Sequence, residues 1–219
     1  MASNVETILE RHRVVAPVNS DRDPRIDAAK GVAIVLVVLG HAKGIPPWFT
    51  VLAYSFHVPL FFVLSGWLSH RRDAYAMRQL LDTLIRTLLV PYVFFFLVAY
   101  AYWLLTRNIG GKALRWGQLP WWDPLAGLLT GIGPQLYVHP ALWFLPALFV
   151  TALVYQWLRR AIQPEVIALL SLPTALAWIL AFPSAGMRLP FALDVLPVAL
   201  LFYALGAVAG RSATLPRTV

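Results

Sequence analysis

The sequence predicts an all-α fold, a polytopic transmembrane helix bundle of about six membrane-spanning helices, from three observations. Hydrophobic residues make up 59% and charged residues only 13% of the 219-residue chain, and the mean hydropathy is +0.68. One soluble core of this size cannot bury that much apolar surface. Apolar windows of membrane-spanning length recur, and basic residues lie in short segments between them. The expected partner is the lipid bilayer and not nucleic acid, because the basic residues form no single patch.

The first 24 residues form a polar segment. They contain Arg11, Arg13 and Arg22 and lack the apolar core and the small-residue cleavage site of a signal peptide. We therefore expect a cytoplasmic N-terminal tail at residues 1–24, a transmembrane domain at 25–211 and a C-terminal tail at 212–219.

Membrane-spanning helices are predicted where about 17 to 25 consecutive residues are mostly apolar, the length that crosses roughly 30 Å of hydrocarbon. These windows lie at 26–42, 51–68, 86–105, 141–158, 166–182 and 191–209. Residues 116–138 stay open between a re-entrant and a spanning segment, because their apolar part contains Gly131, Gly133 and Pro134. The tryptophan-rich run at 116–122 is typical of an interfacial belt.

Lysine and arginine set the expected orientation, because they accumulate on the cytoplasmic side. With a cytoplasmic N-terminus, 13 of the 18 Lys and Arg residues fall on the inner side. This split supports a cytoplasmic N-terminus in a multi-pass protein, which we expect in the inner (plasma) membrane. The same bias explains Arg71, Arg72 and Arg78 in one inner loop, with attraction of phosphates as the alternative.

The chain contains no cysteine, which excludes disulfides, thiolate catalysis and cysteine-ligated zinc. Three histidines, His41, His57 and His139, fall toward the outer side. They are candidates for a catalytic cluster, for contacts to an acceptor sugar or for a three-histidine metal site. No tight ligand spacing supports the last reading, so no metal is expected.

Four sequence motifs carry a resemblance to a known family. They are Arg25-Ile-Asp-x-x-Lys30-Gly31 followed by His41, the run His57-Val-Pro59-Leu-Phe-Phe-Val-Leu-Ser65-Gly66-Trp67, Pro91-Tyr92, and Leu142-Trp143-Phe144-Leu145. Over about residues 25–210 the chain resembles membrane acyltransferase family three, which includes bacterial O-antigen and fucose O-acetylases. Members usually have about ten membrane helices, so the resemblance implies a short or truncated member.

The resemblance implies transfer of an acyl group, usually acetyl from cytoplasmic acetyl-CoA, to a hydroxyl of a glycan or lipid-linked acceptor outside the cytoplasm. Acetyl-CoA or another acyl-CoA is then the donor substrate, and an oligomer is compatible with the sequence. Two alternatives need no acyl donor: a transporter or channel whose polar residues line a route for solute or protons, and a non-enzymatic membrane scaffold.

The first predicted helix carries two ionisable residues on one face. Eleven residues at ~100° each return Lys30 and His41 to nearly the same side, about 16 Å apart along the axis. That span is on the order of an extended pantetheine arm. We hypothesise that Lys30 and Arg25 bind CoA phosphates while the thioester reaches toward His41. Lys30 alone is also typical of an interfacial anchor.

His41 suits a general base, because its unperturbed pKa lies near 6.5 and an apolar site favours the neutral imidazole. The short connection from 42 to 50 makes the first two helices an antiparallel hairpin, so His57 is expected at a similar depth. We predict both histidines as catalytic, with helix packing as the alternative for each.

The remaining candidates contact substrates. Arg86, at the start of the third predicted helix, is a donor-binding candidate beside Lys30 and Arg25. Trp143 and His139 are acceptor-binding candidates, with packing and interfacial solvation as their alternatives. Asp194 is expected either to bind acceptor hydroxyls or to pair with Arg188.

Overall fold

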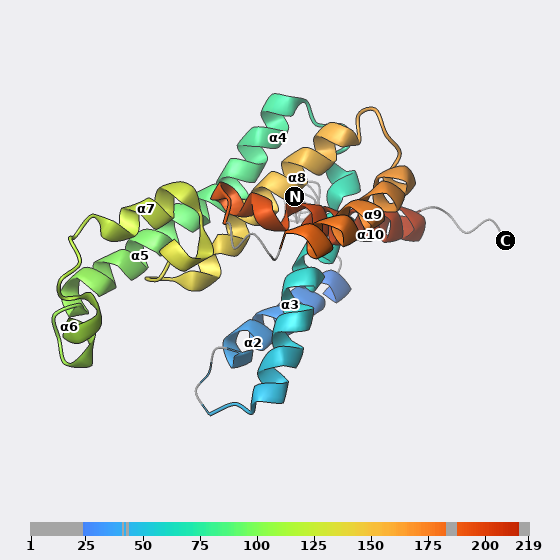
Figure 1. Cartoon of the computed structure of the whole chain (residues 1–219). Coiled ribbons are helices and arrows are strands. Elements are labelled where there is room, and N and C mark those ends of the chain that lie inside the picture. Colours follow the sequence, from blue (N-terminus) through green and yellow to red (C-terminus); the bar gives the residue numbers. More distant parts are fainter. Residues whose placement is uncertain (1–23, 41, 43, 183–187, 215–219) are drawn as a thin grey trace, which may run out of the picture.

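The computed structural model describes residues 24–40, 42, 44–182 and 188–214 and shows a helical protein (Figure 1). Within these residues there is no β-strand, which confirms the predicted all-α class. The longer helices are α2 (Pro24–Gly40), α3 (Pro47–Trp67), α4 (Met77–Leu84), α5 (Val90–Thr106), α7 (Asp123–Thr130), α8 (Phe144–Leu158), α9 (Pro164–Ala181) and α10 (Leu196–Thr214). Shorter helical turns are η1 (Ser69–Arg72), η2 (Ile85–Leu89), α6 (Gly111–Trp116), η3 (Gly133–Gln135), η4 (Pro140–Trp143) and η6 (Pro190–Val195).

Five stretches of the described chain are long and apolar enough to cross a membrane. They are Pro47–Trp67, Met77–Thr106, Pro140–Leu158, Pro164–Ala181 and Pro190–Ala213. The remaining predicted segment, 26–42, corresponds to α2, whose 17 residues extend about 25 Å. Large apolar side chains such as Val35 on α2, Phe94 on α5 and Leu169 on α9 are exposed. This outward apolar surface suits lipid and not water.

The third predicted span begins earlier than expected. Helical structure runs from Met77 through α4, the π-helical turn η2 and α5, so Arg86 lies inside this run and not at its start. The prediction of a start at residue 86 was wrong because α4 is amphipathic: Leu80 and Leu84 are buried while Asp82 is exposed. An apolar window does not detect such a helix. The π-helical turn precedes Pro91, which cannot donate a backbone hydrogen bond.

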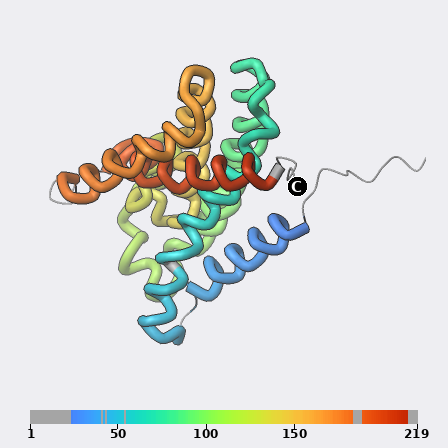
Figure 2. The backbone as a smooth tube through the Cα atoms, turned by 90° about the vertical axis from the view of Figure 1, so that its right-hand side faces the viewer, coloured from blue at the N-terminus to red at the C-terminus, as the bar shows by residue number. Residues whose placement is uncertain are grey.

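Helices α3 and α10 cross in close contact (Figures 1 and 2). Gly66 on α3 faces the backbone of Tyr203, and a Cβ atom at Gly66 would collide with the Tyr203 carbonyl. Gly206 and Gly210 on α10 approach the carbonyls of Val63 and Trp67 in the same way. Glycines four residues apart let helix backbones approach, as in many membrane helix pairs. Helices α8 and α9 pack against the same α10.

Residues 107–139 contain short helices, the longest of eight residues, which is too short to cross a membrane. The segment folds back along α5, where the Tyr92 hydroxyl donates to the carbonyls of Gly127 and Leu128 at 3.2 and 2.8 Å. The structure therefore excludes the spanning alternative for 116–138. In the same segment the Tyr137 hydroxyl donates to Asp123 at 2.8 Å. Burial, and then this hydrogen bond, raise the pKa of Tyr137 well above its usual range, which keeps the phenol a neutral donor.

Candidate functional site

The main cavity has a volume of about 620 Å³ and lies where α2, α3 and the segments around η4 and η6 meet. Its walls are mostly apolar, and three side chains supply most of the chemistry: His57, Arg188 and Asp194. The cavity is lined by Ile34, Val37, Val38, His57, Val58, Phe61, Ile132, Gly133, Pro134, Pro140, Ala141, Trp143, Phe144, Arg188, Ala192, Asp194 and Val195. An apolar cavity with few convergent polar groups is the usual form of a small-molecule site.

His57 is held in a defined orientation by α3. The residue is 5% exposed, and its Nδ1 lies 2.6 Å from the carbonyl oxygen of Ala53, one turn earlier. A carbonyl oxygen only accepts, so this contact requires the proton on Nδ1. With the proton on Nδ1, the other ring nitrogen, Nε2, is the atom suited to accept a proton in catalysis.

Asp194 reaches the cavity through a bent segment, η6. Phe191 and Ala192 have φ angles of 54° and 53°, in the left-handed region that residues other than glycine rarely adopt. Gly131, itself at φ 66°, lies against this bend, since a Cβ atom there would be 3.3 Å from the Cα of Phe191. Two unfavourable backbone conformations are thus held by packing, at the point where Asp194 enters the site.

The carboxylate of Asp194 is paired with Arg188. Arg188 donates from Nη1 to Oδ2 at 3.1 Å, and the backbone N–H of Leu189 donates to Oδ1 at 3.4 Å. Trp178 on α9 fixes the backbone of the same residue, because its Nε1 donates to the Asp194 carbonyl at 2.6 Å. Of the two alternatives in the sequence, the structure shows the pairing with Arg188.

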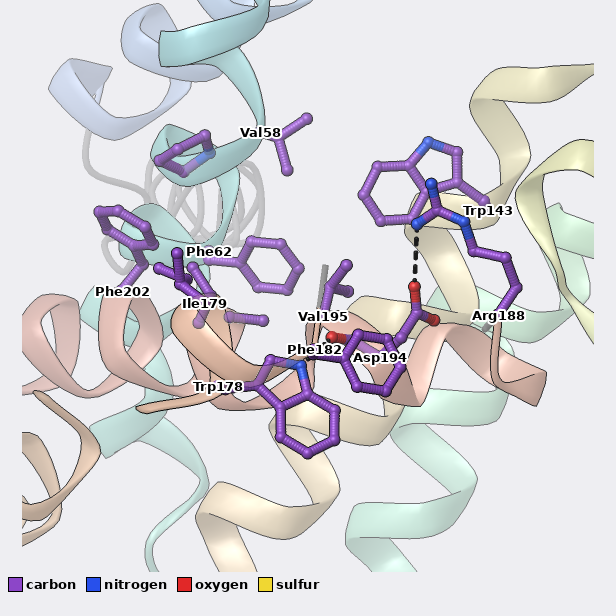
Figure 3. A pocket seen from close by; sticks show the side chains of 13 residues that line it. Val58, Phe62, Trp143, Trp178, Ile179, Phe182, Arg188, Asp194, Val195 and Phe202 are labelled. Atoms are coloured by element: carbon purple, nitrogen blue, oxygen red, sulfur yellow. Dashed lines mark hydrogen bonds and ion pairs between the residues drawn. The ribbon is translucent and has the colours of Figure 1, made fainter. Parts of the chain in front are cut away.

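A second cavity of about 500 Å³ adjoins the first (Figure 3). The two share Val58, Trp143, Arg188, Asp194 and Val195 as lining residues. The remaining walls come from α3, α9 and α10 and are mostly apolar, including Phe62, Trp178 and Phe202. The Arg188–Asp194 ion pair, dashed in Figure 3, therefore lies at the border of two compartments whose other walls are mostly apolar.

Among the predicted acceptor-binding residues, Trp143 and Asp194 line both cavities. His139 is half-buried and lines neither, although the following Pro140 and Ala141 line the larger one. His41, predicted as the base, lies outside the described residues. The structure thus brings His57, Trp143 and Asp194 together from three separate parts of the sequence.

The predicted donor-binding residues lie away from both cavities. Lys30 is half-buried on α2, and Arg25 is exposed near its start. Arg86 is exposed and forms an ion pair of 2.9 Å with Asp82 one turn earlier. None of the three lines either cavity.

Sequence reasoning missed two features of the site. Arg188 was considered only as a partner of Asp194, although its guanidinium lines both cavities. The left-handed pair Phe191 and Ala192 gave no signal, because neither residue type favours that conformation. For metal binding, no group of three or more histidine and acidic side chains gathers in the described part of the chain, which does not include His41.

The described residues form a polytopic all-α membrane protein with a buried histidine in a largely apolar cavity. A family model described as an acyltransferase domain, Acyl_transf_3, matches residues 23–219. The chain belongs to this family, the membrane acyltransferase family 3 that its motifs resemble. Neither a curated protein nor a solved structure matches the chain.

Proposed function

We propose that the protein is an O-acyltransferase that moves an acyl group, acetyl in the simplest case, from acyl-CoA to a hydroxyl of a glycan or lipid-linked acceptor outside the cytoplasm. Family membership supports acyl transfer in general. The observation that carries the proposal is the buried, oriented His57 in a cavity large enough for a small substrate. Trp143 in the cavity wall offers an aromatic face on which a sugar ring can stack.

In this mechanism Nε2 of His57 accepts the proton of the acceptor hydroxyl as its oxygen attacks the thioester carbonyl carbon. The carbon–sulfur bond of the tetrahedral intermediate then breaks. The imidazolium returns the proton to the leaving thiolate, which gives free CoA and an ester. Since the proton on Nδ1 is bound to the Ala53 carbonyl, the imidazole keeps one orientation in both steps.

His41 is the second candidate for this proton transfer. Ile34, Val37 and Val38 on α2 line the cavity, and the chain continues from this helix to His41, which lies outside the described residues. The proposal therefore keeps both predicted histidines, and single substitutions at each separate their roles.

The negative charge that develops on the thioester oxygen needs a donor. We assign this role to Arg188, whose guanidinium borders both cavities and has N–H groups beyond the one bound to Asp194. Asp194 is then a positioning residue, because its carboxylate holds the guanidinium. The apolar compartment next to this pair would accept the chain of an acyl group or of a lipid-linked acceptor.

The test is transfer of label from radioactive acetyl-CoA to a lipid-linked glycan fraction in membranes that contain the protein. We expect label in the glycan as an ester that mild alkaline hydroxylamine releases, and no label when the acceptor fraction is left out. Solute uptake into vesicles without any acyl donor, together with no ester formation over a panel of glycans, would favour a transporter and contradict the proposal.

A further inference from the structure

A separate polar cavity of about 260 Å³ lies at the other end of α3 and α8 from the candidate site. Its polar walls come from Arg72, Asp73, Tyr75, Gln156, Arg159 and Arg160. Helical rise places it about 15 to 20 Å away, since ten residues of α3 follow His57 and Gln156 lies twelve residues after Phe144 on α8. In the predicted orientation this end faces the cytoplasm.

The cavity carries an excess of positive charge. Three guanidinium groups and one carboxylate line it. Asp73 forms one ion-pair contact with Arg159, with 3.6 Å between Oδ2 and Nη2. Within the described ranges, Arg160 has no carboxylate within 4 Å. Arg160 is exposed and Arg72 and Arg159 are partly buried, and an anion bound between them would relieve the repulsion of their like charges.

One wall of the cavity is held in place by a buried hydrogen bond. Gln156 is 5% exposed, and its Nε2 donates to the Ser69 carbonyl at 3.0 Å, which ties the end of α8 to η1. The hydroxyl of Tyr203 on α10 is fully buried and lies within reach of the Arg72 side chain, one of the cavity's polar groups.

We propose that this cavity binds a phosphate group at the inner face of the membrane. Guanidinium forks match phosphate oxygens in paired hydrogen bonds, and Arg72 and Arg160 are the groups best placed to supply them. The volume corresponds to roughly eight water molecules, which suits a phosphate or diphosphate and not a whole nucleotide.

Two kinds of ligand contain such a phosphate group: the nucleotide part of acyl-CoA and the headgroup of an anionic lipid. Binding of acyl-CoA here rests on the proposed function. Phosphates bound here would leave the pantetheine arm a distance of about 15 to 20 Å to the histidine cavity, on the order of its extended length. If acyl-CoA is the ligand, its phosphates are bound not by Lys30 and Arg25 but by Arg72 at the end of η1 and by Arg160, just after α8.

The experiment measures binding to the purified chain in phosphatidylcholine nanodiscs, with adenosine 3′,5′-bisphosphate as the first probe. The variant is Arg72→Gln with Arg160→Gln, which leaves the Arg159–Asp73 pair intact. The matched control is Arg115→Gln, an exposed arginine on α6 that lies over Trp116. We expect the double variant to weaken binding at least tenfold and the control to leave it unchanged.

The second arm uses discs enriched in phosphatidylglycerol and measures retained lipid by native mass spectrometry. Retention of this lipid that depends on the two arginines, without nucleotide binding, would support the phosphate site. It would also show that the site does not bind the acyl-CoA donor. If neither probe depends on Arg72 and Arg160 in variants that unfold at the wild-type temperature, the proposal is wrong. Nucleotide binding without acyl transfer would refute the proposed function and leave the phosphate site standing.

Discussion

The two partners of the Arg188–Asp194 ion pair differ in exposure. Removing one of them therefore changes the free energy of unfolding more than removing the other. The Arg188 side chain is 61% exposed and that of Asp194 only 7%. Removing the arginine leaves a buried carboxylate without its counter-charge, whereas water can solvate a guanidinium that has lost its partner.

We therefore expect Arg188→Ala to lower the free energy of unfolding by roughly 2 kcal/mol and Asp194→Asn by less. The double variant should be no less stable than Arg188→Ala alone, because the two residues act as a unit. Thermal unfolding in detergent micelles measures all three. Equal losses that add in the double variant would contradict this explanation.

At the residue scale, residue types and motifs in the sequence predict which side chains belong to the site, but not how they are arranged. His57, Trp143 and Asp194 are predicted in this way, and all three line the cavity. Their meeting depends on the left-handed bend at Phe191 and Ala192, which is fixed by contact with Gly131, sixty residues away in sequence. Such a tertiary contact overrides local preference and leaves no local pattern.

At the element scale, the crossing of α3 and α10 depends on the absence of side chains at three glycines. A methyl group at Gly206 would collide with the Val63 carbonyl, whereas nothing lies within 4 Å of a Cβ atom at Gly31 on α2. We expect Gly206→Ala to destabilise the protein by about 1 to 3 kcal/mol through overpacking.

Gly31→Ala is the matched control, and it should be neutral or stabilising by up to about 1 kcal/mol, because alanine favours a helix. Thermal unfolding and the fraction of monodisperse protein after detergent extraction report on both variants. A Gly206→Ala protein as stable as wild type would show that the two helices can separate without loss.

A second prediction concerns the segment that folds back along α5. Tyr92→Phe removes the hydroxyl that donates to the carbonyls of Gly127 and Leu128, at a cost of about 1 kcal/mol. Amide hydrogen exchange should become faster in α7 and η3. Tyr102→Phe should leave that exchange unchanged, because the Tyr102 hydroxyl contacts Lys112 and not α7. Unchanged exchange in Tyr92→Phe would mean that other contacts hold the segment.

Most helices were predictable because apolar length alone defines a membrane span. The windows at 141–158 and 166–182 match Pro140–Leu158 and Pro164–Ala181 closely. The window at 191–209 covers η6 and most of α10, but hydropathy contains no information on the bend between them. Helix α4 was missed because an amphipathic helix that packs on the core has polar residues on its other face.

At the scale of the whole molecule, the positive-inside bias predicts that the ends of the bundle face opposite compartments. The absence of cysteine makes this testable with single introduced thiols. Gln118→Cys, in an exposed turn after α6, should react with a membrane-impermeant maleimide in intact cells. Ala74→Cys, exposed between η1 and α4, should react only after permeabilisation. The reverse pattern would invert the topology and place the histidine cavity toward the cytoplasm.

A comparison of two histidines, His57 within α3 and His70 just beyond its end, tests most directly whether His57 acts in catalysis. His57 lines the cavity, whereas His70 makes a similar contact, Nδ1 to the Trp67 carbonyl at 2.9 Å, at the C-terminal end of α3 and lines neither cavity of the candidate site. Transfer of label from acetyl-CoA to glycan should fall at least about 100-fold in His57→Ala and stay near wild type in His70→Ala. Full transfer by a folded His57→Ala protein would contradict the proposal that His57 is the catalytic base.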